Sequence, residues 1–166
     1  MRSFLGGLRS ACLCVFLSLS FVSSIAFAQL GDLVVEFPGL NAGKFVYDAS
    51  RNRVYASITD QDQVAIIDND THSLITTIPV APAPVGLAVS NDGNRLFVAS
   101  SVIPNIEVID LNILQPVNSF STQIPLYDLV AANNDILYAT PAVNSNRGIF
   151  QIDANAGFVM LGVNLQ

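Results

Sequence analysis

From residue 43 onward, apolar residues occur in short runs that polar turn residues separate. The runs are four to six residues long and rich in Val, Ile, Phe and Tyr, as in "RVYASI", "RLFVAS" and "VAIID". Clusters of Asn, Asp, Gly, Pro and Ser lie between them. Runs of this length and composition are typical of β-strands joined by turns. This part of the chain sustains no apolar period of 3.6 residues, which would indicate a helix.

The same pattern of strands and turns occurs three times. The segment "KFVYDASRNRVYASITDQDQVAIIDNDTHSLITTI" aligns without a gap on "GLAVSNDGNRLFVASSVIPNIEVIDLNILQPVNSF", so that Tyr55 corresponds to Phe97 at an offset of 42 residues. In a third copy, Tyr138 follows Phe97 by 41 residues. A fixed period of this length indicates a repeat architecture. We expect repeats at about residues 43–80, 86–122 and 127–163.

Each repeat contains four predicted strands. In the second repeat they cover about residues 86–90, 95–100, 106–110 and 116–120. The dipeptide Asp92-Gly93, between the first two, is a strong signal for a two-residue hairpin. Four antiparallel strands in about 40–45 residues make up one blade of a β-propeller. The predicted fold class is therefore all-β, with three propeller blades of about 42 residues.

The second repeat resembles the YVTN family of β-propeller repeats. "PVGLAVSNDGNRLFVAS" followed by "IEVID" is similar to the family pattern, although Asn91 stands where the family usually has Pro. The first and third repeats lack the Asp-Gly turn. The resemblance covers about residues 43–163 and implies a propeller fold. It implies little about function, because family members range from surface-layer and adhesion proteins to enzyme subunits. The matching residues are Pro84, Gly86, Ala88, Ser90, Asp92, Gly93, Phe97, Val98, Ile109 and Asp110.

Three blades are fewer than the four or so that a closed ring needs. An extra apolar stretch, "LVVEF" at residues 33–37, resembles the outer strand "LITTI" of the first repeat. Such a strand could complete a last blade, yet the third repeat has its own outer strand in "FVMLGV" at residues 158–163. Two explanations stay open. Either the chain is part of a longer propeller, or it closes by association, with two copies making six blades. Residues 29–166 alone would leave two open blade faces, which favour self-association.

The first 28 residues are typical of a secretory signal peptide. Arg2 and Arg9 precede an apolar run, and "SSIAFA" ends with small residues at Ala26 and Ala28. The most apolar part is about a dozen residues long, shorter than the ~20 that span a bilayer comfortably. An uncleaved membrane anchor is the alternative, because residues 11–28 carry no charge. Cleavage would leave residues 29–166 as a repeat domain that is secreted, periplasmic or at the surface of a bacterial cell.

Cleavage would also change the chemistry of the chain. Both cysteines, Cys12 and Cys14, lie in the leader, so the mature domain would contain no thiol. Loss of the two leader arginines leaves 5 basic and 13 acidic residues, and the formal net charge moves from −6 to −8. Such a surface repels phosphate backbones and is not attracted to anionic lipid headgroups. We therefore expect no nucleic-acid partner, and no membrane association after cleavage.

The residues that could carry chemistry have simpler structural explanations. Asp68, Asp110 and Asp153 recur after the third strand of each repeat, where Asp accepts backbone N–H groups of the following turn. The acidic turns "DQDQ" and "DNDT" lack the ligand order of a calcium loop. The lone His72 cannot supply the several imidazoles of a typical zinc or copper site, and we expect it in an exposed turn. No nucleophile-elbow, Walker or dinucleotide motif occurs. We therefore predict no catalytic, cofactor-binding or metal-binding residues, and no enzymatic activity.

Two other recurring features are also expected to be structural. The aromatic residues Tyr55, Phe97 and Tyr138 occupy one strand position in every repeat, which favours packing between blades over a binding platform. The prolines of "PVAPAPV" fall between the first and second repeats, where a stiff connector is needed.

The links between strands differ at the two ends of the blades. At one end they are short and alike: "ASRN", "NDGN" and "ANND". At the other they are "TDQDQ", "SVIPN" and "PAVNSNRG", which differ in length and charge. Binding residues concentrate on variable loops held by a rigid scaffold, so we expect a protein or small-molecule ligand at this second end. The candidate residues are Asp60, Asp62, Asn105, Asn144 and Arg147.

These observations favour an exported, non-enzymatic binding or scaffold module, as part of a longer propeller. One alternative is a piece of a propeller enzyme, lactonase-like or a quinoprotein subunit, whose catalytic residues lie outside this chain. Another is a cell-surface structural or adhesion protein.

We predict that the mature chain begins at Gln29, because the small residues before it fit signal-peptidase cleavage. N-terminal sequencing of protein recovered from the periplasm or the medium tests this. Recovery of a chain that still carries residues 1–28 would contradict it.

Overall fold

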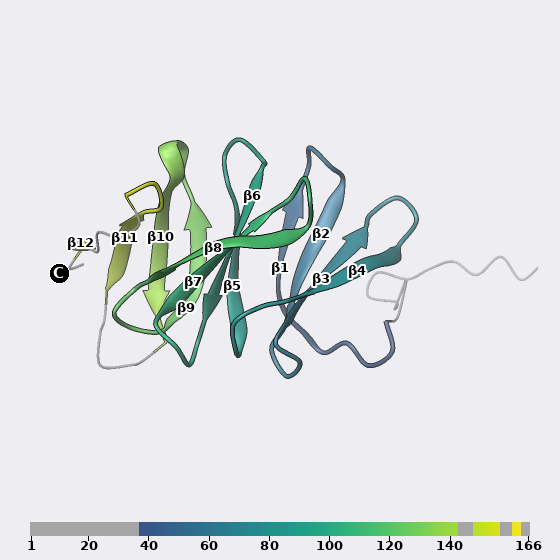
Figure 1. Ribbon diagram of the computed structural model, residues 1–166, viewed down its shortest axis with the longest axis horizontal. Coiled ribbons are helices and arrows are strands. Elements are labelled where there is room, and N and C mark those ends of the chain that lie inside the picture. The colour runs from purple at the N-terminus through teal and green to yellow at the C-terminus, as the bar shows by residue number, and fades with distance from the viewer. Residues whose placement is uncertain (1–36, 143–147, 157–160, 164–166) are drawn as a thin grey trace, which may run out of the picture. The chain divides into compact units, whose positions relative to one another are not determined.

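The structure is a computed structural model that describes residues 37–142, 148–156 and 161–163. Within these residues the chain forms three four-stranded antiparallel sheets (Figure 1). The predicted strand at residues 33–37 lies almost wholly outside the described residues. Sheet 1 contains β1 (Ala42–Asp48), β2 (Arg53–Ile58), β3 (Gln63–Asp68) and β4 (Ser73–Pro79). Sheet 2 contains β5 (Pro84–Val89), β6 (Arg95–Ser100), β7 (Asn105–Asp110) and β8 (Gln115–Ser121). Sheet 3 contains β9 (Leu126–Ala131), β10 (Ile136–Pro141), β11 (Ile149–Asp153) and β12 (Leu161–Val163), with a short 3₁₀ turn, η1 (Asn133–Asp135), between β9 and β10.

The three sheets coincide with the three predicted repeats. Each sheet takes its strands in chain order, from an inner strand to an outer one. The register repeats as well, because Tyr55 pairs with Ile66, Phe97 with Val108, and Tyr138 with Gln151. The prediction of antiparallel four-stranded units is therefore confirmed. The sheets do not close into a ring in the described part of the chain.

The predicted two-residue hairpin at Asp92-Gly93 is wrong. β5 ends at Val89 and β6 begins at Arg95, and Gly93 N donates to Ser90 O at 2.9 Å. Gly93 has a φ of +72°, a left-handed conformation that suits glycine. The longer loop forms because the Asp92 carboxylate accepts bonds from Ser90 Oγ at 2.6 Å and Asn94 N at 3.0 Å, which close it from within.

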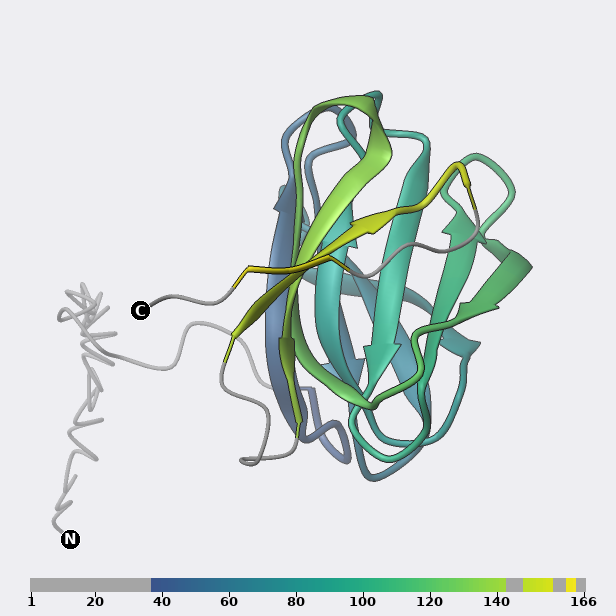
Figure 2. The ribbon, with the colours of Figure 1, turned by 90° about the vertical axis from the view of Figure 1, so that its left-hand side faces the viewer.

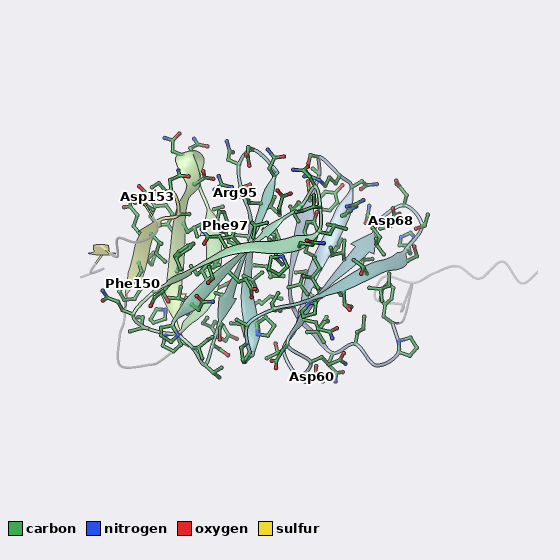
Figure 3. The ribbon with its side chains drawn as sticks, in the orientation of Figure 1. Asp60, Asp68, Arg95, Phe97, Phe150 and Asp153 are labelled. Atoms are coloured by element: carbon green, nitrogen blue, oxygen red, sulfur yellow. The ribbon has the colours of Figure 1, made fainter. Side chains whose placement is uncertain are left out.

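Both faces of the sheets carry apolar residues, because successive strand residues point to opposite sides and runs such as Leu96–Ala99 are apolar at every position. We call the face that packs against the next sheet along the chain the forward face, and the opposite one the rear face. On the forward face of sheet 1, Tyr55 and Val64 pack against Leu87 and Leu96 on the rear face of sheet 2. On the forward face of sheet 2, Phe97 packs against the rear face of sheet 3 (Figure 3). That rear face contributes Leu126, Leu129, Leu137, Ala139 and Ile152.

The expected role of the repeated aromatic residues holds for two of the three. Tyr55 and Phe97 are fully buried between sheets. Tyr138 occupies the same position but lies on the forward face of sheet 3, where no described sheet follows, and 40% of it is exposed. The crossing between β4 and β5 is the predicted connector, formed by residues 80–83.

The inner strands β1, β5 and β9 lie side by side, with β5 in the middle. Gly86 of β5 allows the close approach of β9. A methyl group at Gly86 would lie 3.0 Å from Leu129 N and 3.1 Å from Asp128 Cα. Backbone atoms cannot move aside as the end of a flexible side chain can, so this position requires glycine.

We predict that Gly86→Ala lowers the free energy of unfolding by about 1–3 kcal/mol, because the added methyl group overpacks the contact with β9. Gly43→Ala in β1 is the matched control. Its methyl group would lie 3.3 and 3.4 Å from the side-chain oxygens of Thr59 and Ser57, and its nearest backbone atom, Ser57 O, would be at an ordinary contact distance of 3.8 Å. Urea unfolding measures both, and equal losses for the two variants would contradict the prediction.

Candidate binding surface

The ends of the sheets differ in the links they carry. The turns β2–β3 and β6–β7 and the crossings β4–β5 and β8–β9 lie at one end, which we call the Asp60 end. Figure 3 shows Asp60 at this end, opposite the end that carries Asp68, Arg95 and Asp153.

Asp60 and Asp62 lie together in the β2–β3 turn, and both are exposed. Asp60 accepts a bond from the Asn41 side chain at 3.0 Å. Asp62 instead secures the β4–β5 crossing, because its carboxylate accepts Ala83 N at 2.8 Å and its carbonyl accepts Val80 N at 2.9 Å. No sequence pattern indicates this bond, which joins residues 21 positions apart.

The other candidates are less closely grouped. Asn105 begins β7 at the same end, is half-buried, and donates its N–H to Ile103 O at 2.8 Å. Asn144 and Arg147 lie outside the described residues. The structure therefore brings two of the candidates together in one turn and places a third in the next sheet.

At the opposite end, the recurring aspartates cap their turns as predicted. Asp68 Oδ1 accepts Thr71 N at 2.8 Å and Asp70 N at 3.0 Å. Asp110 Oδ1 accepts Asn112 N at 2.7 Å, and Asp153 Oδ1 accepts Asn155 N at 2.9 Å. The bonds from the backbone and hydroxyl of Thr71 lower the pKa of Asp68. His72 lies exposed in the first of these turns, also as predicted.

A buried carboxylate, Asp48, closes the β1–β2 turn. It accepts Ser50 Oγ at 2.6 Å, Arg51 Nη1 at 3.2 Å and the buried Tyr55 hydroxyl at 3.1 Å. Burial alone would raise the pKa of Asp48, but the bonds from Ser50 and Arg51 outweigh it and the pKa is lowered. Burial and the neighbouring Asp48 charge raise the pKa of Tyr55 to about 12.

The corresponding turn of sheet 2 makes the same bond with the two residues exchanged. Ser90 stands at the position of Asp48, and Asp92 at the position of Ser50. In both turns a hydroxyl donates to a carboxylate at 2.6 Å. The bonds from Ser90 and Asn94 lower the pKa of Asp92 to about 2.

Two arginines at this end connect neighbouring sheets. Arg51 donates to the Gly93 carbonyl and, at 2.7 Å, to Asn112 Oδ1, so it joins sheet 1 to two turns of sheet 2. Arg95 of sheet 2 forms an ion pair with Asp135 beside sheet 3. Its guanidinium also lies 5.7 Å from the centre of the Phe97 ring.

A third charged contact spans the inner strands. Lys44, Gly86 and Asp128 occupy the same position of the three repeats, 42 residues apart. Lys44 Nζ lies 3.1 Å from Asp128 Oδ2, so the pair joins β1 to β9 past β5. The hydrogen bond to Asp128 raises the pKa of Lys44. Tyr127 lies beside the pair, with its ring centre 5.1 Å from Lys44 Nζ.

The outward faces of the first and last sheets carry exposed apolar side chains. Phe45 and Tyr47 are exposed on β1, and Val130 and Tyr138 on sheet 3. Figure 2 views the molecule from the side of sheet 3. Sheet 3 also carries a shallow apolar hollow of ≈ 170 Å³. Its lining is Asp128, Leu129, Val130, Tyr138, Ala139, Thr140 and Ile149.

Two negative findings apply to the described residues. They contain no group of three or more His, Cys, Asp or Glu side chains arranged to hold a metal ion. They also contain no helix of the length and apolarity needed to cross a membrane.

Comparison with solved structures identifies the architecture. The chain aligns with hydrazine synthase of Kuenenia stuttgartiensis at a TM-score of 0.66 and 16% identity, over 82% of this chain and 38% of that one. It aligns with the β-propeller domain of Cps50 (Swd1) from Myceliophteria thermophila at a TM-score of 0.64 and 12% identity, over 79% and 41%. The chain has a β-propeller fold. Streptogramin B lyase is a further neighbour, with a TM-score of 0.61, 10% identity, and coverage of 78% and 42%.

The propeller fold is all that these neighbours share with the chain at such low identity. The chain spans about two fifths of the length of each. No protein-family model and no curated protein sequence matches it. The named neighbours include enzymes and a propeller domain without a named reaction, so the fold does not choose between catalysis and binding.

We predict that the protein loses stability between about pH 4 and pH 2. The pKa values of Asp48, Asp68 and Asp92 are lowered in the folded state, and that of Asp92 is about 2. The unfolded chain takes up these protons near its ordinary pKa of about 3.9, so the stabilisation is full above that pH and lost as the pH falls through the folded values. Urea unfolding at a series of pH values measures the loss.

Ser90→Ala tests the assignment to individual bonds. Removal of the Ser90 hydroxyl should raise the pKa of Asp92, which a carboxyl NMR titration reads directly. Ser119→Ala, at an exposed position of β8, is the control and should leave that titration unchanged. For the predicted loss of stability at low pH, a urea midpoint that stays constant from pH 6 to pH 2 would be the contradicting result.

Proposed function

We propose that this chain is a non-enzymatic binding or scaffold module of an exported bacterial protein, built from YVTN-type blades, and that its ligand binds at the Asp60 end. The ligand is a protein or a small molecule. The observation that carries this proposal is the set of hydrogen bonds that the Asp and Glu side chains accept from the chain itself.

Within the described residues, each Asp and Glu other than Asp70 accepts a hydrogen bond from the chain itself. Most of these carboxylates close turns or join sheets. Glu107, for example, accepts Ala81 N in the β4–β5 crossing at 2.6 Å. Hydrogen bonds to a carboxylate favour its charged form, so a carboxylate held in this way is less suited to act as a general acid. This use of the acidic residues favours binding over catalysis.

Asp60 differs from the other acidic residues in its partner. Its carboxylate is exposed and bonds to the side chain of Asn41, which is itself exposed. A ligand can replace that bond without opening a turn. The neighbouring Asp62 makes the same end acidic, so a ligand with basic or hydrogen-bond-donating groups suits it.

The YVTN assignment is supported by the roles of the residues that carry the resemblance. Ser90, Asp92 and Gly93 close the β5–β6 turn, and Asp110 caps the turn after β7. These are structural bonds within a blade, which accounts for their presence in proteins of different functions.

A photo-activated cross-linking residue at position 60 of the full chain tests the proposal in the producing cell. We expect it to capture one discrete partner, whereas the same residue at Asp70 should not. Asp70 is the matched control because it is an exposed aspartate in a turn at the opposite end. Equal capture from both positions would count against the Asp60 end, and so would a purified full chain that turns over a lactone substrate.

A further inference from the structure

Exposed apolar residues gather at the Asp60 end, in the β6–β7 turn and the crossing beside it. Val102 and Ile103 are 59% and 36% exposed, and Pro104 follows them, also exposed. Pro82 of the β4–β5 crossing is exposed as well, and its carbonyl accepts the Ser100 hydroxyl at the base of the turn, at 2.6 Å. Single exposed apolar side chains are normal on a protein surface, whereas contiguous ones mark interaction sites. We call Pro82, Val102, Ile103 and Pro104 the apolar ledge.

The β6–β7 turn does not need apolar residues to form. The β2–β3 turn has the same length and lies 42 residues earlier in the chain. It carries Asp-Gln-Asp at residues 60–62, where the β6–β7 turn carries Val-Ile-Pro at residues 102–104, and all six residues are exposed. Burial within the described part of the chain therefore does not account for the apolar residues at 102–104. A contact with another molecule does.

The apolar ledge is ordered by bonds within the chain. The hydroxyl of the buried Ser100 accepts Val102 N at 3.2 Å and Ile103 N at 3.1 Å. Asn105 N donates to Ile103 O at 2.8 Å and closes the turn. Because the backbone is already held, a partner that binds here does not need to order a loop, and that cost is avoided.

The acidic β2–β3 turn lies beside the apolar ledge. Ala83 N donates to the Asp62 carboxylate at 2.8 Å, and Ala83 O accepts Ser101 N at 3.1 Å, so this one residue links the two turns. Packed sheets lie roughly 10 Å apart, a distance that about three extended residues span. A single short segment of a partner therefore reaches from Asp60 to Val102.

The charge at this end indicates the charge of the partner. Asp60 is exposed, and its carboxylate bonds to the neutral side chain of Asn41. Among the described basic residues, the three arginines lie at the opposite end of the sheets, and Lys44 is paired with Asp128. A Lys or Arg of a partner thus complements the negative charge of Asp60.

The shape of this surface favours a protein over a small molecule. The residues of the apolar ledge stand exposed in a turn and a crossing, whereas a small-molecule site is concave and encloses most of its ligand. The apolar hollow described above lies on sheet 3, and none of its lining residues belongs to the turns of the Asp60 end.

We propose that the Asp60 end binds a protein segment that carries a Lys or Arg about three residues from an apolar side chain. The apolar side chain packs on Val102 and Ile103, and the cation pairs with Asp60. This inference rests on the proposed function, which places the ligand at the same end. It adds the class of the partner and the residues that the partner contacts.

Binding of synthetic peptides to the full chain tests the proposal. The chain is expressed with its leader, so that the natural form of the protein is measured. Each labelled peptide carries one Leu and one Lys, about one to seven residues apart in a Gly-Ser background, and matched peptides replace Leu with Ser or Lys with Gln. Fluorescence anisotropy gives the dissociation constants. We expect the tightest binding at a spacing of about three residues, and binding weaker by about threefold or more after either replacement.

Variants of the protein assign each preference to its residues. Val102→Ser/Ile103→Ser should abolish the preference for Leu over Ser, and Asp60→Asn the preference for Lys over Gln. Each protein change removes the partner of one peptide group, so the matching peptide change should then weaken binding no further. Ile113→Ser is the control, because Ile113 is an exposed isoleucine in the β7–β8 turn at the opposite end. Urea midpoints close to that of the wild type confirm that each variant is folded.

The contradicting results are distinct from those of the proposed function. Binding that does not depend on Leu, on Lys or on the variants of the Asp60 end overturns the inference, and so does a failure of every peptide to bind. If photo-cross-linking from position 60 captures a discrete partner, and Val102→Ser/Ile103→Ser leaves that capture undiminished, the Asp60 end remains the binding site and the apolar contact is wrong. Equal capture from positions 60 and 70 counts against both.

Discussion

The sheets carry apolar residues on both faces, and the burial of these faces against neighbouring sheets is the constraint that organises the described part of the chain. Full burial of a side chain such as Phe97 contributes about 1.5–3 kcal/mol, which no single surface bond matches. Sheet 2 therefore packs against a neighbour on each of its faces. The turns and charged contacts have a different task. Apolar burial brings the sheets together, and the charged contacts orient them. Asp48 positions Arg51, which bonds to sheet 2, and Arg95 pairs with Asp135 beside sheet 3.

Much of the fold could be predicted because it depends on short-range features of the sequence. The strands follow from alternation over a few residues, and the turn caps follow from Asp68 and Asp110, which bond to N–H groups two or three residues ahead. These caps determine backbone shape even where composition gives no hint of it. His72 and Leu114 share no chemistry, yet both adopt a left-handed conformation at the same turn position, with φ of +51° and +56°.

The contacts between sheets could not be predicted in this way. Arg51 and Gly93 are 42 residues apart, and Lys44 and Asp128 are 84 apart. The exchange of Asp48 and Ser50 for Ser90 and Asp92 hides a conserved bond from any comparison by residue identity. For the candidate site, the sequence identified the turn that holds Asp60 and Asp62. It did not identify the role of Asp62, which depends on a crossing that folds back over the turn.

The contact of Lys44 with Asp128 has a consequence for geometry. It joins the first and third inner strands directly, so the length of one lysine side chain limits how far these two sheets can splay apart. In a ring of repeated units, the rotation from one unit to the next is the full circle divided by their number. The Lys44–Asp128 pair spans two successive rotations, so its length is sensitive to the angle between neighbouring sheets. The pair is partly exposed and contributes little to stability, so it favours, without fixing, a rotation between sheets that keeps β1 and β9 within reach of one lysine side chain.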